Sequence, residues 1–234
     1  MRSFLFLHAF LRLGTCSGLH APTPGAFPSG GRSKPTAFER DGGVAYVAHF
    51  LSQADFGIVQ RERSKMQKQL KPEQNAFATK RLCATVPRAS PLSEIFSADR
   101  VVQRLNKLTG LELRPEGDAV PLELRLYGAG AFMEWHVDDC LLPGNQVEVV
   151  YTVDNDSDSK TQWLVQGAVV EEQTEPNSVV IIMANGPQHQ VTPLRRGSRS
   201  IIKAVFSDRA ALVDGAPADA PAAPPTAPRK GKRR

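Results

Sequence analysis

LELRLYGAGAFMEWHVDD, residues 122–139, marks a change of periodicity along the chain. Before it, apolar residues recur at the three- and four-residue spacing of helices. From residue 120 on they form short runs rich in β-branched and aromatic residues, separated by turn signals such as YGAGA, LPGN and EPNS. About eight strands with this spacing predict a jelly-roll barrel. The predicted strands are residues 122–127, 131–138, 146–153, 161–166, 168–173, 178–184, 190–194 and 199–206.

Two helices are expected ahead of the strands, so residues 39–119 are interpreted as a helical support for a core at 120–208. Ser52, with Asp55 three residues later, is a capping signal, and the apolar pattern that follows stops at Lys71-Pro72. A second helix is expected from about Ser97 to a C-terminal cap at Gly110.

Both ends of the chain have a composition that favours no packed core. Residues 1–38 join an apolar stretch to a Gly/Pro/Ser-rich, acid-free segment, which indicates a targeting or disordered leader. An organelle, and first of all a plastid, is the predicted destination. The secretory pathway or endoplasmic reticulum, the mitochondrion and the cytoplasm are the alternatives. Residues 209–234 are Pro/Ala-rich and then basic, and are predicted to be a disordered tail.

The net charge of +5 belongs to these ends. Residues 1–38 carry four basic and no acidic side chains, and residues 214–234 carry five basic and two acidic ones, which leaves about −2 for residues 39–213. A faintly acidic body argues against a nucleic-acid partner. Three cysteines without a CxxC pair argue against a disulfide scaffold or a structural zinc site, and no apolar run is long enough for a transmembrane helix.

His136 and Asp138 are the first candidate metal ligands. Side chains two apart in a strand point to the same face, so an imidazole and a carboxylate would converge on one point. Two imidazoles and one carboxylate on one face of Fe(II) leave three coordination positions open. The only later histidine of the chain is His189, which follows the predicted strand 178–184.

Arg199 and Tyr127 are the candidate ligands for the carboxylate of a co-substrate bound beside the metal. A guanidinium ten residues after His189 is suited to pair with a carboxylate, and a phenol nine residues before His136 can reach the same group. Each residue also has an ordinary interpretation: a hydrogen-bonded strand histidine for His136, a surface arginine for Arg199, a packing tyrosine for Tyr127. The ordered set of residues favours the metal site.

YGAGAFMEWHVDD (127–139) and PNSVVIIMANGPQHQVTPLRRGSRSIIKAVF (176–206) together resemble the catalytic region of the prolyl 4-hydroxylase-like 2-oxoglutarate/Fe(II) dioxygenases. The resemblance implies a double-stranded β-helix (jelly-roll) core with flanking helices. It also implies an Fe(II) site at His136, Asp138 and His189, and binding of 2-oxoglutarate at Arg199 and Tyr127. Residues 149–165 lack the Gly-Gly-Glu-Thr stretch common in the prolyl hydroxylases.

The activity that the resemblance implies is hydroxylation with Fe(II), 2-oxoglutarate and O2, with L-ascorbate as a further expected cofactor. The substrate is expected to be a protein side chain, most simply proline, or a small metabolite. A non-catalytic jelly-roll binding protein and a nucleic-acid demethylase are the alternatives. The sequence carries no indication of oligomeric state.

Overall fold

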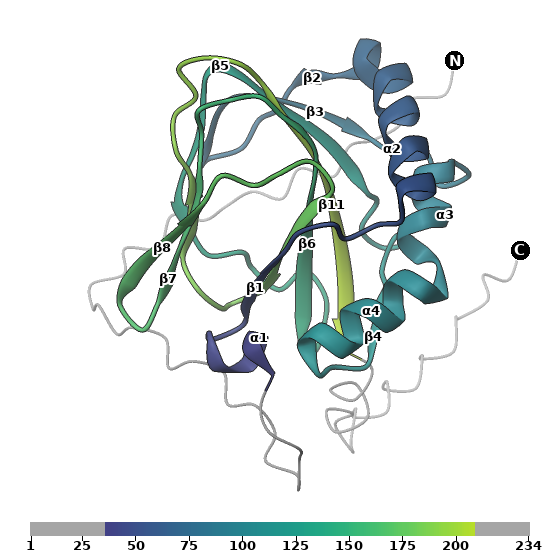
Figure 1. Cartoon of the computed structure of the whole chain (residues 1–234), viewed down its shortest axis with the longest axis vertical. Coiled ribbons are helices and arrows are strands. Elements are labelled where there is room, and N and C mark those ends of the chain that lie inside the picture. The colour runs from purple at the N-terminus through teal and green to yellow at the C-terminus, as the bar shows by residue number, and fades with distance from the viewer. Residues whose placement is uncertain (1–35, 209–234) are drawn as a thin grey trace, which may run out of the picture.

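One strongly curled antiparallel sheet forms the fold of residues 36–208, the part of the chain that the computed structural model describes (Figure 1). The mainly β jelly-roll core predicted from the strand pattern is confirmed. The strands are β1 (Val44–Val47), β2 (Lys71–Pro72), β3 (Ala78–Thr85), β4 (Leu113–Pro115), β5 (Glu123–His136), β6 (Gln146–Asn155), β7 (Thr161–Val165), β8 (Ala168–Glu172), β9 (Ser178–Met183), β10 (His189–Val191) and β11 (Arg199–Asp208).

The long strand β5 joins the two parts of the curled sheet. The order of neighbouring strands is β1-β9-β6-β11-β5-β10-β7-β8, with β3 also paired to β5 and β4 to β11. The first part of β5 pairs with β11 and β3, whereas its end pairs with β10. The sheet therefore bends round on itself at β5 and encloses an interior.

The expected turn YGAGA is not a turn: β5 runs through it without a break, which corrects the prediction of two separate strands. Gly130 adopts a φ of 79°, and the opposite strand β3 shifts register between Thr79 and Arg81, where Lys80 has a φ of 53°. Glycine permits such a local bend, so the strand changes direction and keeps its ladder. The bend carries the end of β5 across to β10.

The helices are α1 (Ala37–Arg40), α2 (Gln53–Met66), α3 (Pro91–Ser97) and α4 (Asp99–Thr109), with a short 3₁₀ helix, η1, at Gln67–Gln69. As expected, the Ser52 side chain caps α2 by accepting from the Asp55 N–H. Gly110 ends α4 in the left-handed conformation. Helix α2 ends at Met66 and continues as η1 to Gln69, so the helical stretch ends just before Lys71-Pro72, as expected.

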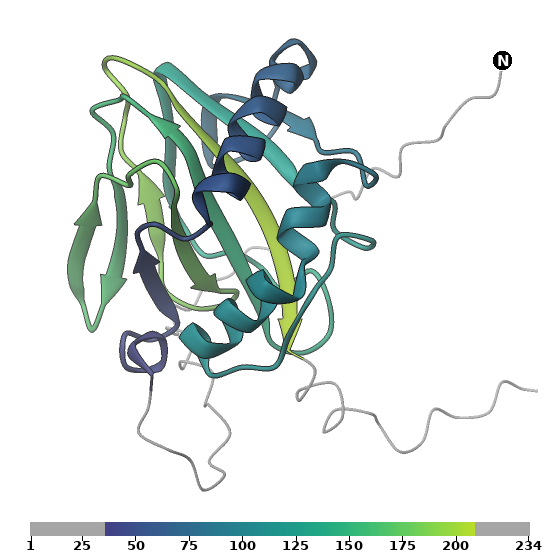
Figure 2. The ribbon, with the colours of Figure 1, turned by 45° about the vertical axis from the view of Figure 1, so that its right-hand side comes forward.

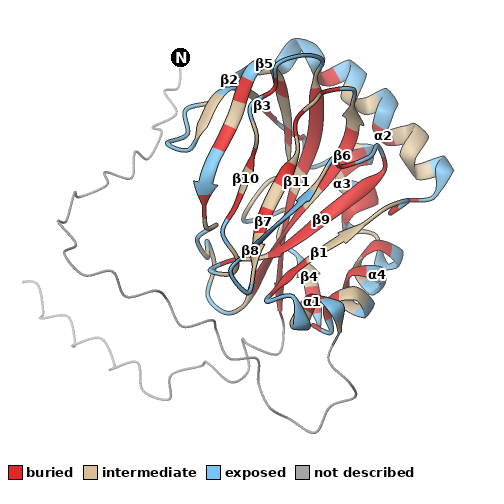
Figure 3. Ribbon diagram, turned by 60° about the vertical axis from the view of Figure 1, so that its left-hand side comes forward, coloured by how far each residue is buried: buried red, intermediate tan, exposed pale blue. Residues whose placement is uncertain are grey.

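Helices α2, α3 and α4 lie against one face of the sheet (Figure 2). They bury Val59, Leu92 and Leu105 in one core cluster with residues of β6 and β11. Buried residues therefore concentrate in the central strands, while β8 and the outer sides of the helices are exposed (Figure 3). In residues 36–208 no helix is long and apolar enough to cross a membrane.

Two of the expected boundaries change. Residues 39–119 contribute strands β1 to β4 as well as helices, so they are more than a helical support. Phe38 was expected to lie in the leader, yet it follows the N-cap residue Thr36 in α1 and is fully buried in the core. The fold therefore begins by Thr36, because burial of Phe38 ties this segment down. The predicted targeting function of the leader and the predicted tail at 209–234 lie outside the described residues, apart from Thr36 to Phe38.

Candidate metal centre

His136 and His189 face each other across two paired strands. His136 is the last residue of β5 and His189 the first of β10, and the two are direct partners in the antiparallel register. Their ring centroids are 4.1 Å apart. The chain reaches His189 through a tight turn at Gly186, where an added Cβ would lie 2.5 Å from the carbonyl oxygen of Met183. Two imidazoles distant in sequence are thus brought together by strand pairing.

Asp138 joins them from outside the ladder. The sequence argument placed His136 and Asp138 on one continuous strand, but β5 ends at His136 and Asp138 lies in the irregular segment that follows, which corrects that premise. The carbonyl oxygen of Asp138 accepts a hydrogen bond of 2.7 Å from the N–H of Asn185, which lies in the turn after β9. This bond holds the segment beside the turn that leads to His189.

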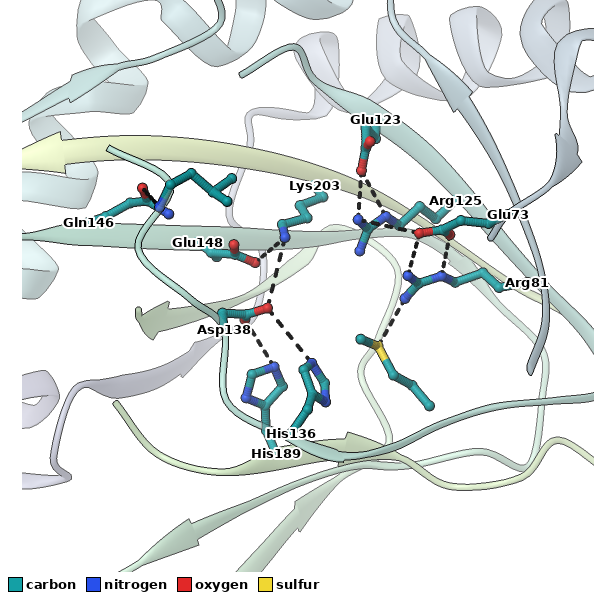
Figure 4. Close-up of polar contacts among 12 residues, drawn as sticks. Glu73, Arg81, Glu123, Arg125, His136, Asp138, Gln146, Glu148, His189 and Lys203 are labelled. Atoms are coloured by element: carbon teal, nitrogen blue, oxygen red, sulfur yellow. Dashed lines mark hydrogen bonds and ion pairs between the residues drawn. The ribbon is translucent and has the colours of Figure 1, made fainter. Parts of the chain in front are cut away.

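The three side chains form a compact group of ligand atoms (Figure 4). One possible ligand atom from each of His136, Asp138 and His189 lies within 4.8 Å of the other two. Among residues 36–208, this set of side chains could hold a metal ion. The Asp138 carboxylate is 3.1 Å from Nε2 of His189 and 3.8 Å from Nε2 of His136. All three side chains are largely buried.

Backbone carbonyl oxygens contact Nδ1 of both histidine rings and so fix the orientation of the rings. Nδ1 of His136 is 2.8 Å from the carbonyl oxygen of Glu134, and Nδ1 of His189 is 3.2 Å from that of Pro187. A neutral ring with its hydrogen on Nδ1 can donate to this carbonyl and present the lone pair of Nε2 to a metal ion. Two neutral imidazoles and one carboxylate are the donor set that suits Fe(II) with open positions.

The electrostatics of the group keep it ready to bind a cation. Burial, together with the neighbouring His189, lowers the pKa of His136 to about 4, so its imidazole is neutral near pH 7. Burial alone would raise the pKa of Asp138, but the hydrogen bond with His189 and the charge of Lys203 hold that pKa below its usual range. A carboxylate anion therefore lies beside the neutral imidazole of His136.

Glu148 and Lys203 form a charged pair next to Asp138, as Figure 4 shows. Nζ of Lys203 is 2.5 Å from Glu148 and 3.9 Å from Asp138. Burial raises the pKa of Glu148 to about 7, and the charge of Asp138 adds to this effect. Sequence reasoning missed both residues. A charged residue inside each of two apolar runs, QVEVVYTV and RSIIKAVF, was the available signal.

Arg199 and Tyr127, the predicted ligands of 2-oxoglutarate, line the same pocket as His136, Asp138 and His189. They are direct partners across β11 and β5, and both are 1% exposed. Nε and Nη1 of Arg199 are buried without a hydrogen-bond partner among residues 36–208. Burial lowers the pKa of Arg199. An unpartnered buried guanidinium is costly, so the site calls for an anion at this position.

Three further polar residues line the pocket and were not predicted. Arg81 of β3 donates to Tyr127, and the Thr161 hydroxyl of β7 is buried without a partner among the described residues. Arg125 lies close to Glu73. The sequence gives no signal for Arg81, because residues 72–96 show no strand or motif pattern. Thr161 begins a predicted strand, but threonine is common in strands and does not indicate a site. Burial, which identifies them, is not visible in the sequence.

Phe77, in the loop between β2 and β3, lies against the candidate metal ligand His136. Its ring stacks on that of His136, with centroids 5.5 Å apart and planes at 21°, while the residue is 44% exposed. The ring thus has one face on a predicted metal ligand and other atoms in solvent. Asp139, next to the predicted ligand Asp138, is exposed.

The comparisons with known proteins give a structural likeness only. No protein family model matches the chain, and no curated protein matches it. A prolyl 4-hydroxylase from Pseudomonas putida superposes with a TM-score of 0.58 at 18% identity, over 72% of this chain and 94% of that one. The fold of residues 36–208 is therefore shared with an enzyme of the class that the sequence resembles.

Two other similar structures contain different bound molecules. A prolyl hydroxylase from Trichoplax adhaerens, in complex with a peptide fragment of hypoxia inducible factor, has a TM-score of 0.60 at 14% identity over 76% of this chain and 89% of that one. The epimerase SnoN, in complex with Fe3+, alpha ketoglutarate and nogalamycin RO, has a TM-score of 0.60 at 14% identity over 84% and 94%. The chain has the jelly-roll fold of the 2-oxoglutarate/Fe(II) oxygenases.

Proposed function

We propose that this protein is an Fe(II)- and 2-oxoglutarate-dependent dioxygenase. The observation that carries the proposal is the meeting of His136, Asp138 and His189 in a buried pocket that also holds Arg199, whose Nε and Nη1 have no hydrogen-bond partner among residues 36–208. The donor set suits iron, and the arginine suits the second carboxylate of a dicarboxylic co-substrate. The likeness to oxygenases of this class supports the same function.

With O2 as the oxidant, bound iron and 2-oxoglutarate would supply the oxidising chemistry: the co-substrate loses CO2 and takes one oxygen atom of O2 to become succinate, and the other oxygen atom hydroxylates the substrate. The chain itself has three tasks. His136, Asp138 and His189 would hold the metal on one face. Arg199 and Tyr127 would hold the distal carboxylate. The apolar residues Val180 and Ile182 of the pocket would keep water away from the bound groups.

We further propose a protein side chain or a small metabolite as the substrate. One oxygenase of this fold is in complex with a peptide fragment and another with nogalamycin RO, so the fold accommodates both kinds of ligand. Phe77, exposed and stacked on His136, is the side chain we assign to the substrate's path to the metal. L-ascorbate as a reductant, and a plastid destination encoded in the leader, are proposals that rest on the resemblance and on the sequence of residues 1–38.

The two alternatives are less favoured. A binding protein without turnover has no need of a complete metal triad, and the triad is complete. A nucleic-acid demethylase needs a basic substrate face, whereas residues 39–213 carry a net charge of about −2.

The decisive experiment incubates the full chain with Fe(II), 2-oxoglutarate and O2 and measures succinate. Uncoupled turnover without a substrate is expected in the wild type and not in His189→Ala. His49→Asn is the control, because His49 is exposed, lies outside the pocket and has a positive φ that asparagine tolerates. Equal succinate formation in wild type and His189→Ala would disprove the proposed function.

A further inference from the structure

Arg81 is the third member of a row of buried polar residues across three neighbouring strands. Arg81 of β3 is the register partner of Tyr127 in β5, and Tyr127 is the partner of Arg199 in β11. All three are 1% exposed and line the pocket. The two arginines differ in one respect: Arg199 has unpartnered nitrogens, whereas Arg81 is engaged on several sides.

The contacts of Arg81 hold it in one orientation. Nε and Nη2 donate to the two carboxylate oxygens of Glu73 at 2.5 and 2.6 Å, which is a bidentate pair. Nη1 donates to the hydroxyl of Tyr127 at 2.8 Å and lies 2.9 Å from the sulfur of Met133. Since Glu73 fixes the guanidinium plane, Nη1 is a fixed donor to the tyrosine.

This hydrogen bond decides what the Tyr127 hydroxyl does. A guanidinium has donors and no acceptor, so the tyrosine oxygen must accept, and its own hydrogen must point elsewhere. Among residues 36–208 the hydroxyl also contacts the sulfur of Met133 at 3.8 Å, which is a weak acceptor. The O–H is therefore free to donate to a stronger acceptor in the pocket, beside the unpartnered nitrogens of Arg199.

We propose that Arg81 is a positioning residue for 2-oxoglutarate, which it serves through Tyr127. Arg81 holds the phenol so that its O–H donates to the distal carboxylate that pairs with Arg199. Glu73 in turn holds Arg81. The inference rests on the proposed function, since it presupposes that 2-oxoglutarate is the co-substrate.

Calorimetric titration of 2-oxoglutarate into the full chain loaded with Mn(II) tests the proposal without turnover. The variants are Arg81→Met, Tyr127→Phe and the double variant, with Arg88→Met as the control because Arg88 is an exposed arginine outside the pocket. Each single variant is expected to weaken 2-oxoglutarate binding about tenfold, which corresponds to one hydrogen bond to a charged group. The double variant is expected to lose no more than either single one, because both remove the same hydrogen bond. Mn(II) affinity and Arg88→Met are expected to stay at the wild-type values.

A second probe separates positioning from general damage. 2-Oxobutyrate lacks the distal carboxylate, so its affinity is expected to be the same in wild type and Arg81→Met. Removal of Arg81 leaves Glu73 within 3.8 Å of Arg125, which keeps a cation beside that carboxylate. Should Arg81→Met fail to fold, Arg81→Lys enters the same cycle, because lysine retains the charge but cannot reproduce the fork.

The outcomes distinguish this inference from the function on which it rests. A tenfold loss from Arg81→Met that persists in the Tyr127→Phe background, or an equal loss for 2-oxobutyrate, overturns the positioning role and leaves the dioxygenase intact. No binding of 2-oxoglutarate to the wild-type Mn(II) protein overturns both.

Discussion

The two faces of strands β6 and β11 have opposite compositions. On the face toward the helices, Val149 and Tyr151 of β6 and Ile202 and Phe206 of β11 are buried in the main apolar core. On the other face the same strands direct charged side chains into the interior of the curled sheet: Glu148 of β6, and Arg199 and Lys203 of β11.

This difference separates stability from function along a single strand. Side chains of a strand alternate between faces, so Ile202 belongs to the core while its neighbours Ile201 and Lys203 belong to the pocket side. Apolar burial on the helix face stabilises the fold. Buried charges on the inner face cost free energy unless a partner compensates them. Glu148 and Lys203 compensate each other, whereas Arg199 has unpartnered nitrogens.

His189→Ala should have the largest effect. Loss of one of three ligands is expected to weaken Fe(II) or Mn(II) binding by more than about 100-fold, the upper range for changes in residues that only support a ligand. The unfolding temperature of the metal-free protein should change little between the wild type and His189→Ala. Metal affinity by calorimetry tests this, and wild-type affinity in His189→Ala would refute the assignment.

Ile202→Ala should show the reverse pattern. Ile202 is fully buried on the helix face, so the substitution is expected to cost about 2–5 kcal/mol of unfolding free energy. Metal affinity measured on the folded protein should remain that of the wild type. Denaturant unfolding gives the first quantity and calorimetry the second. A loss of metal affinity without a loss of stability would contradict the separation of the two faces.

Arg199→Met tests the same strand from the inner face. Affinity for 2-oxoglutarate is expected to fall about 100-fold, as for the loss of a charged, bidentate contact, while metal binding is retained. The unfolding free energy should stay the same or rise, because the substitution removes a buried cation that has unpartnered nitrogens. A marked loss of stability would show that Arg199 is structural.

Glu73→Gln should have the smallest effect, and one that depends on pH. Burial by itself would raise the pKa of Glu73, but the hydrogen bonds from Arg81 and the charge of Arg125 hold it below its usual value. A lowered pKa stabilises the fold above the unfolded value of 4.5, and this contribution is lost as the pH falls through the lower folded value.

The unfolding free energy of the wild type should therefore exceed that of Glu73→Gln by about 1.5 kcal/mol near pH 7, which is the low end for a hydrogen bond to a charged group. The difference should shrink as the pH falls below 4.5. Unfolding by urea at several pH values measures it. A difference that grows toward acid pH would refute the ion pair as its source.

Much of the fold and of the site could be predicted because the relevant signals are local. Strand alternation and turn residues predicted the jelly roll, and the order of His136, Asp138, His189 and Arg199 predicted the site. Strand β3 was missed because ATKRLCAT buries Arg81 and has no simple apolar alternation. Glycine permits both a turn and a bent strand, so the sequence alone does not distinguish the bend in β5 from a turn.

The sequence by itself determined which residues we assign to the site: two histidines, one aspartate and one arginine, in an order that resembles a known class. Only the tertiary structure decided how they meet. Asp138 lies beyond the end of β5 and is held by Asn185, and His189 reaches His136 through strand pairing. It also decided that Arg81, Glu148 and Lys203 lie in the interior. The physical reason is that burial and pairing of charges depend on contacts between distant segments, and no local pattern encodes them.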